Sequence, residues 1–165
     1  MWKSALAAVV LVVAGGLAQA QELKIGYVDL QRVLRDAQPA KAAQAKLEAE
    51  FGKREKDLAD MAARLKSASD RLDRDAPTLS ESERQRRQRE LVEQDREFQR
   101  KRREFQEDLT QRKNEELAQV LDRANRAVKQ IFDQDKYDLI LQEVVFAGPR
   151  VDITKRVIDA LNNGK

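Results

Sequence analysis

The sequence contains no cysteine and no histidine, and only six of its 165 residues are glycine. The chain therefore lacks the usual general base, the thiol nucleophile and the preferred zinc ligands. No disulfide can form, so stability must come from packing or association. The glycines after residue 20 stand singly, so the sequence offers no glycine-rich loop to cradle a phosphate. These absences argue against an enzyme and against a bound cofactor or metal.

Large apolar side chains are also scarce, whereas charge is abundant. Aromatic residues make up 5% of the chain and charged residues 37%. A composition dominated by Ala, Glu, Lys, Arg, Leu and Gln is typical of long helices and coiled coils. The core must therefore be thin, or shared between chains.

The first twenty residues predict an export signal. Lys3 supplies a positive start, residues 5–13 are apolar, and Ala18-Gln19-Ala20 has the small-x-small pattern that a signal peptidase cuts. A transmembrane anchor is the competing interpretation, but the apolar run is shorter than the roughly 20 residues that a spanning helix needs. We expect cleavage after Ala20, which removes Lys3 and leaves 31 of the 32 basic residues against 29 acidic ones.

The centre of the chain predicts two long helices that fold back on each other at residues 76–80. Pro77 disfavours helix for the residue before it, and Ser80 with Glu83 forms a capping box that restarts one. Apolar residues recur at intervals of seven on both sides of this break, as in a coiled-coil seam: Phe51, Leu58, Leu65 and Leu72 before it, Leu91, Phe98 and Phe105 after it. Residues 40–116 are therefore expected to form an antiparallel hairpin of roughly 50 Å, with residues 76–80 at its tip.

The two ends of the chain predict a smaller α+β body, formed by residues 21–39 and 117–165. Short β-branched or aromatic runs indicate strands at 22–28, 137–141 and 144–147. Helices are expected over 30–36 and after Asp152. The long helix becomes more apolar from Leu117 to Phe132, where the hairpin offers it no partner, and three strands are near the minimum for stability, so we expect oligomerisation. The expected core of the body and the assembly is Ile25, Val28, Leu121, Val128, Ile131, Leu139, Leu141 and Val145.

The return helix carries a basic segment. Between Arg84 and Lys113 there are eleven basic and seven acidic residues, and residues 100–103 are the densest part. One interpretation is a solvated helix face; the other is binding of an anion, which could be nucleic acid, anionic lipid or an acidic protein. Phe98 and Phe105 are either seam residues or contacts for a bound protein. The candidate contact residues are Leu79, Phe98, Phe105, Arg100, Arg102 and Arg103.

Several short motifs, in this order of elements and behind an export signal, resemble the Skp (OmpH) family of periplasmic chaperones. The motifs are Leu47-Glu48 with Glu50-Phe51, then Phe105, Asp108, Arg112 and Asn114-Glu115-Glu116, and finally Asp152-Ile153-Thr154. The resemblance covers nearly all of the chain after residue 20.

This resemblance implies a homotrimer whose helical hairpins project from a β-containing trimerisation body and surround a cavity. It implies a holdase that, without ATP or any cofactor, keeps unfolded outer-membrane β-barrel proteins from aggregating in the periplasm. The family's proposed lipopolysaccharide site would fall on Lys101 and Arg112, but Gln111 stands where a basic residue is expected. Two other functions stay open at this point: a basic nucleic-acid-binding coiled coil and a structural spacer of the cell envelope.

Overall fold

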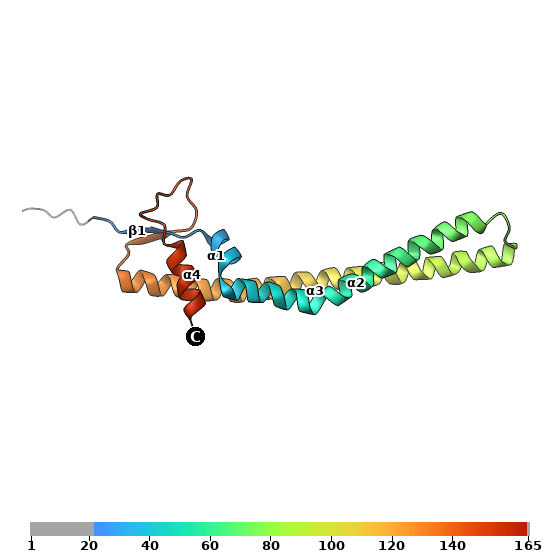
Figure 1. Ribbon diagram of the computed structural model, residues 1–165, viewed down its shortest axis with the longest axis horizontal. Helices are drawn as coiled ribbons and strands as arrows, with labels where there is room; N and C mark the ends of the chain where they lie inside the picture. The colour runs from blue at the N-terminus through green and yellow to red at the C-terminus, as the bar shows by residue number, and fades with distance from the viewer. Residues whose placement is uncertain (1–21, 165) are drawn as a thin grey trace, which may run out of the picture.

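The computed structural model describes residues 22–164, which form a body and a long helical arm (Figure 1). The predicted export signal lies outside these residues. No helix in the described part of the chain is long and apolar enough to cross a membrane. In chain order the elements are β1 (Ile25–Tyr27), α1 (Leu30–Asp36), α2 (Gln38–Asp75), α3 (Glu81–Asp135), β2 (Leu139–Leu141) and α4 (Thr154–Asn163).

The arm consists of α2 and α3, which lie side by side and cross along their length (Figure 1). The predicted reversal at residues 76–80 is confirmed. The hydroxyl of Ser80 accepts a hydrogen bond from the Glu83 backbone N–H at 3.3 Å, which caps α3. Phe51 and Leu72 of the predicted seam are buried, and Leu58 and Leu65 between them are half-buried. The fold class predicted from the sequence, a mostly helical hairpin on a small β-containing body, is confirmed.

The arm continues into the body because α3 is longer than α2. The last part of α3 packs under the sheet and against α4 (Figure 1). Its buried residues recur at helical spacing and belong to the core cluster of the body: Ala124, Ala127 and Ile131. The helix ends at Lys136, which adopts the left-handed conformation, with φ 58° and ψ 48°.

The sheet of the body differs from the predicted one. Strands β1 and β2 pair in parallel, with Ile25 opposite Leu139 and Tyr27 opposite Leu141. On the other side of β1, the backbone N–H of Tyr27 donates to Val151 at 2.7 Å, and that of Ile153 donates to Tyr27 at 2.9 Å. The segment that completes the sheet is therefore 151–153.

The strand predicted at 144–147 is wrong for the single chain. Residues 142–150 form an irregular loop that projects from the body (Figure 1). Val145 and Phe146 in this loop are 87% and 93% exposed, so their side chains find nothing to pack on. A β-branched run forms a strand only where a neighbouring strand pairs with it.

The two ends of the chain are fastened together around α1. Asp29 caps this helix by accepting from the Arg32 backbone N–H at 3.0 Å, and its own N–H donates to the Thr154 hydroxyl at 2.9 Å. Arg32 forms an ion pair of 3.0 Å with Asp152. Asp152 also accepts from the Thr154 N–H at 2.8 Å, and the last helix begins after Ile153, which occupies the N-cap position without a side-chain cap.

Gly26 allows the sheet and the core to approach closely. A Cβ at this position would lie 3.2 Å from side-chain atoms of both Ile140 and Ile153, and 3.3 Å from the Tyr137 ring. The core beneath it includes Val28, Val33 and Val157, all buried. A side chain at position 26 would therefore require Ile140, Ile153 and Tyr137 to shift by a few tenths of an ångström.

The predicted core residues of the body separate into two groups. Val28 and Ile131 are buried, and the half-buried Val128 packs against their core cluster. Leu121 is half-buried. The remaining four were expected in the core, but in the single chain they are exposed, by 36% to 87%: Ile25, Leu139, Leu141 and Val145. They are exposed because the sheet is open at β2 and the 142–150 loop leaves its face uncovered.

Candidate functional site

The arm is available to another protein, because beyond the body its two helices contact only each other. In the half of the arm nearer the body, the rings of Phe51 and Phe105 meet edge to face, with centroids 5.8 Å apart and an interplanar angle of 78°. The guanidinium of Arg54 lies 5.4 Å from the first centroid and 5.7 Å from the second, and forms an ion pair of 2.9 Å with Asp108. This cluster fastens α2 to α3.

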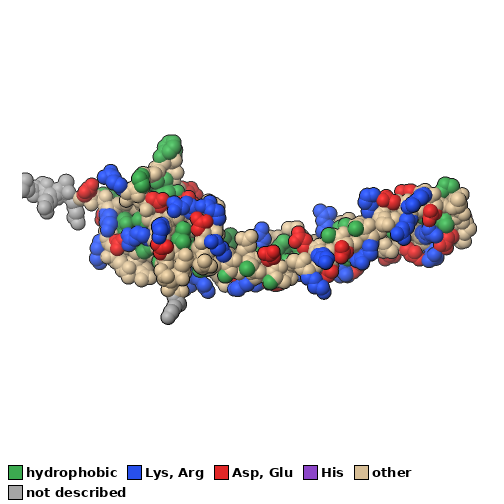
Figure 2. All heavy atoms as spheres, viewed as in Figure 1, with side chains coloured by type: hydrophobic (Ala, Val, Ile, Leu, Met, Phe, Trp, Pro, Cys, Tyr) green, Lys and Arg blue, Asp and Glu red, His purple; other side chains and the backbone are tan. Residues whose placement is uncertain are grey.

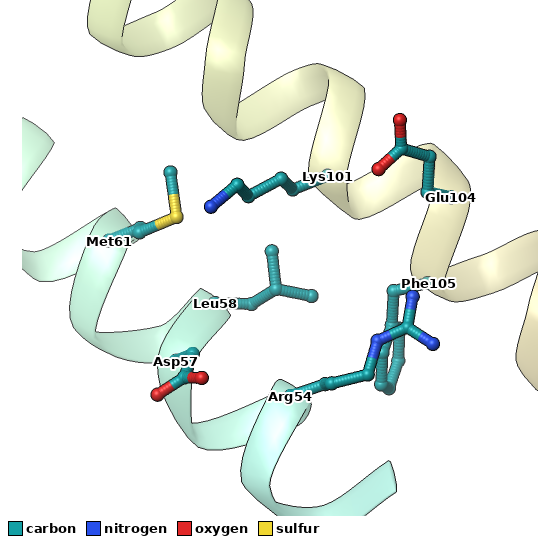
Figure 3. A pocket seen from close by; sticks show the side chains of 7 residues that line it. All are labelled: Arg54, Asp57, Leu58, Met61, Lys101, Glu104 and Phe105. Atoms are coloured by element: carbon teal, nitrogen blue, oxygen red, sulfur yellow. The ribbon is translucent and has the colours of Figure 1, made fainter.

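A small hollow of about 240 Å³ lies beside this cluster (Figure 3). Leu58 projects between the two helices, and Lys101 reaches from α3 towards Met61. Three residues line the hollow from α3: Lys101, Glu104 and Phe105. Lys101 and Phe105 were both predicted as binding residues. The structure brings them to one site but leaves space for only a small side chain.

Nearer the body, Glu116 is a buried carboxylate that joins the two helices. It is 5% exposed and pairs with Lys46 at 3.5 Å and with Arg112 at 3.1 Å. Arg112 also contacts Glu115 and lies 3.2 Å from Glu50. The hydrogen bonds that Arg112 donates, first to Glu115 and then to Glu50, raise the pKa of Arg112. The positive charge of Arg112 is thus compensated within the chain.

The positive charge of the basic cluster at residues 100–103 is partly compensated by neighbouring carboxylates. Arg100 lies 2.7 Å from both Glu97 and Glu104, and Lys101 lies 3.6 Å from Glu97. The hydrogen bond from Arg100 holds the pKa of Glu97 below its ordinary value. Neither Arg102 nor Arg103 forms an ion pair with any residue between 22 and 164. These two exposed residues carry the unbalanced charge of the cluster.

The half of the arm nearer the tip has a groove that the sequence did not predict. We call it the distal groove; its volume is about 620 Å³, and its apolar lining comes from Ala62, Leu65, Leu91, Val92 and Phe98. Phe98 was a predicted contact residue. Val92 was missed, although it is 49% exposed. The signal for it was its position next to Leu91 but off the seven-residue seam, which places an apolar side chain on the outer surface.

The tip is closed by charged side chains. Arg87 of α3 reaches Asp75 at the end of α2 at 3.1 Å and Glu83 at 3.2 Å. Hydrogen bonds from Arg86 and then Arg87 lower the pKa of Glu83 to about 2. Leu79, predicted as a free apolar residue, is half-buried here. The tip is therefore an ordered turn, with less free apolar surface than expected.

Comparisons with known proteins agree with this architecture. The family described as "Outer membrane protein (OmpH-like)" matches residues 24–161. The chain is 29% identical over 143 residues to the chaperone protein Skp of Yersinia enterocolitica, covering 86% of this chain and 87% of that protein. It is 31% identical over 124 residues to Skp of Photorhabdus luminescens, covering 75% and 74%.

A solved structure has the same fold. The crystal structure of an OmpH-like protein from Caulobacter crescentus CB15 aligns with a TM-score of 0.69 and 21% identity, covering 85% of this chain and 84% of that one. Both the sequence and the fold of the chain, a long helical arm on a small body, thus match those of OmpH-like proteins. The chain belongs to the OmpH-like family.

The chaperone function predicted from the sequence is therefore confirmed: the chain is a chaperone of the OmpH-like family, and several of its relatives are named chaperone protein Skp. It is not an enzyme, as its chaperone relatives indicate. The alternatives, a nucleic-acid-binding coiled coil and an envelope spacer, find no support among these relatives.

Proposed function

We propose that the chain is exported, loses its first twenty residues after Ala20, and assembles into a homotrimer whose arms surround an unfolded outer-membrane β-barrel protein. The observation that carries this proposal is the arm itself. Beyond the body, α2 and α3 pack only on each other, and their outer surfaces expose both apolar grooves and charge (Figure 2).

The chemistry of the client supports this proposal. An unfolded barrel protein exposes alternating apolar strands with unpaired edges, which aggregate with each other. Arms that separate one such chain from the next prevent this aggregation. Weak contacts spread along the arm suit many sequences, and no ATP is needed because folding of the client into its membrane provides the driving force for release.

The body supports assembly of several chains. The projecting loop ends in a patch of apolar side chains (Figure 2), and β2 has a free edge in the described chain. Leaving such groups in water exposes the chain to edge-to-edge pairing. Pairing of these surfaces between three copies covers them, which explains why Ile25, Leu139, Leu141 and Val145 are apolar although the single chain exposes them.

A lipopolysaccharide site at Lys101 and Arg112 has weaker support. The charge of Arg112 is compensated by Glu50, Glu115 and Glu116, and Gln111 brings no charge of its own. Any attraction of anions to the arm rests instead on Arg102 and Arg103. Binding of lipopolysaccharide that is unchanged when both are replaced by glutamine would show that another surface is used.

Light scattering tests the proposed activity. A urea-unfolded outer-membrane barrel protein is diluted into buffer with and without the purified chaperone, in the absence of nucleotide. We expect the chaperone to suppress the rise in scattering when it is present at one trimer per client. Scattering that rises equally in both samples would overturn the proposal.

A further inference from the structure

The distal groove exposes apolar surface in the half of the arm nearer the tip, where Val92 is 49% exposed. Val92 belongs both to this groove and to a neighbouring hollow of about 510 Å³ lined by Gln85, Gln88, Arg89, Glu93 and Arg96. An apolar floor and a polar rim therefore meet at Val92. Both α2 and α3 line the floor, which includes the seam residues Leu65, Leu91 and Phe98.

Two ion pairs lie at the groove: Lys66 pairs with Asp70 at 2.7 Å, and Arg96 pairs with Glu93 at 2.9 Å. Two further charges, of opposite sign, form no ion pair with any residue in the range 22–164: Asp95, which lines the groove, and Arg89, which lies on its polar rim. The floor of the groove therefore suits an apolar segment, and Arg89 gives the rim a cation that can pair with a carboxylate next to that segment.

The rim also offers amide groups. The side chain of Gln88 is exposed and makes no hydrogen bond to another described residue, while Gln85 donates to Glu81 at 2.8 Å. A glutamine amide can both donate and accept, so it can satisfy the backbone of an extended chain whose edge is unpaired. A folded helix offers no such free backbone groups.

The size of the groove fits two side chains of an extended segment. From Leu91 to Phe98 the groove runs about 10 Å along α3. Side chains on one face of a strand recur about every 7 Å. Two apolar residues at positions i and i+2 thus fall within the apolar lining.

The helices can adapt here without losing charge pairs. Four residues of α2 form ion pairs with α3. Lys46, Glu50 and Arg54 do so nearer the body than the groove, and Asp75 does so at the tip. From Leu58 to Leu72, no ion pair crosses between the helices among residues 22–164. Apolar contacts, most of them between half-buried residues, hold this stretch together, so a guest side chain can replace part of their packing.

We infer that the distal groove, with Val92 at its centre, binds an extended segment of the unfolded client that carries apolar residues at i and i+2 and an acidic residue beside them. This inference rests on the proposed holding of unfolded proteins and names the surface that does it. Arg89 and Gln88 contact the acidic residue and the free backbone.

The absence of cysteine makes a direct test available. Val92→Cys is labelled with a benzophenone maleimide and illuminated in the presence of a urea-diluted barrel protein. Thr110→Cys, an exposed position on the same helix outside the groove, is the matched control. We expect cross-linking to the client from position 92 and several-fold less from position 110.

Substitution supplies an independent readout. Val92→Glu and Thr110→Glu add the same charge to the same helix, so their stability is comparable. Affinity is measured with a fluorescent peptide of alternating valine and threonine that ends in aspartate. Loss of a buried valine contact corresponds to about tenfold weaker binding, so we expect at least this for Val92→Glu and no change for Thr110→Glu.

The peptide also tests the role of Arg89. Replacing its terminal aspartate with lysine should weaken binding to the parent protein and make no difference to Arg89→Gln. Equal cross-linking from positions 92 and 110, or equal peptide affinity of the two glutamate variants, would overturn the inference while leaving the holding activity intact. A parent protein that fails to suppress client aggregation would overturn both proposals.

Discussion

Phe51 of α2 and Phe105 of α3 join the two helices of the arm through an edge-to-face contact of 5.8 Å between ring centroids. Arg54 lies over both rings. Beyond this contact the seam contains smaller or half-buried residues, so this pair fixes the register of the whole distal arm.

Phe105→Ala should therefore destabilise the arm. Phe105 is half-buried, so the expected loss is about 2 kcal/mol, below the range for a fully buried phenylalanine. Thermal unfolding followed by far-UV circular dichroism measures it. Phe98→Ala is the control, because Phe98 has no aromatic partner among the described residues; an equal loss in the two variants would show that the ring pair contributes nothing of its own.

Glu116→Ala should destabilise the junction of arm and body. The substitution leaves Lys46 and Arg112 without their buried partner, and because both cations remain partly exposed the expected cost is about 1 to 2 kcal/mol. Urea unfolding measures it. The neighbouring Glu115→Ala removes only exposed contacts and should cost less than half as much; the reverse order would contradict the role given to Glu116.

Gly52→Ala should stabilise the arm. A Cβ at Gly52 has no neighbour within 4 Å, so alanine adds helix propensity without a clash. The expected gain is about 1 kcal/mol, seen as a higher midpoint of thermal unfolding. A lower midpoint would mean that the helix needs glycine there, for bending or for close approach of another chain.

The tip should lose stability in acid. Hydrogen bonds from Arg86 and Arg87 lower the pKa of Glu83 from 4.5 to about 2. A lowered pKa in the folded state means that this contribution is complete above pH 4.5 and is lost as the pH falls towards 2. The protection factors of residues 81–87 in amide hydrogen exchange, which correct for the intrinsic effect of pH on exchange, should therefore fall across this window in the parent protein. In Glu83→Gln, the protection factors should be lower from the start and nearly constant; a parent-like profile would exclude Glu83 as the cause.

Val145→Asp should dissociate the assembly and leave the chain folded. Val145 is 87% exposed in the single chain, so aspartate costs nothing there unless another chain covers it. Sedimentation measures the mass, and circular dichroism the helix content. Ile131→Asp differs, because Ile131 belongs to the chain's own core, and it should unfold the body. A Val145→Asp variant that keeps the parent's mass would place the interface elsewhere.

The sequence predicted the arm well because its signals are local. Pro77, Ser80 and the seven-residue seam act within a few turns of helix, and the structure follows them. The sheet was predicted less well. Val144, Val145 and Phe146 have the composition of a strand, but a strand also needs a neighbour, and the chain gives that position beside β1 to residues 151–153.

The distal groove was missed for a related reason. Leu91 and Phe98 were assigned to the seam because they lie seven residues apart. Val92 does not fit this spacing, so it was not considered as a surface residue. Which face of a thin two-helix arm stays open depends on small residues opposite it, such as Ala62 and Ser69, and periodicity along one helix does not reveal them. The sequence also did not reveal that the charge of Arg112 is compensated. Its partners come from both helices: Glu50 of α2, and Glu115 and Glu116 of α3.

Native mass spectrometry of the protein with an unfolded outer-membrane barrel protein tests the central claim most directly. The account predicts a complex whose mass equals three chains without residues 1–20 plus one client, formed without nucleotide. A single chain, or an assembly of any size that carries no client, would contradict it.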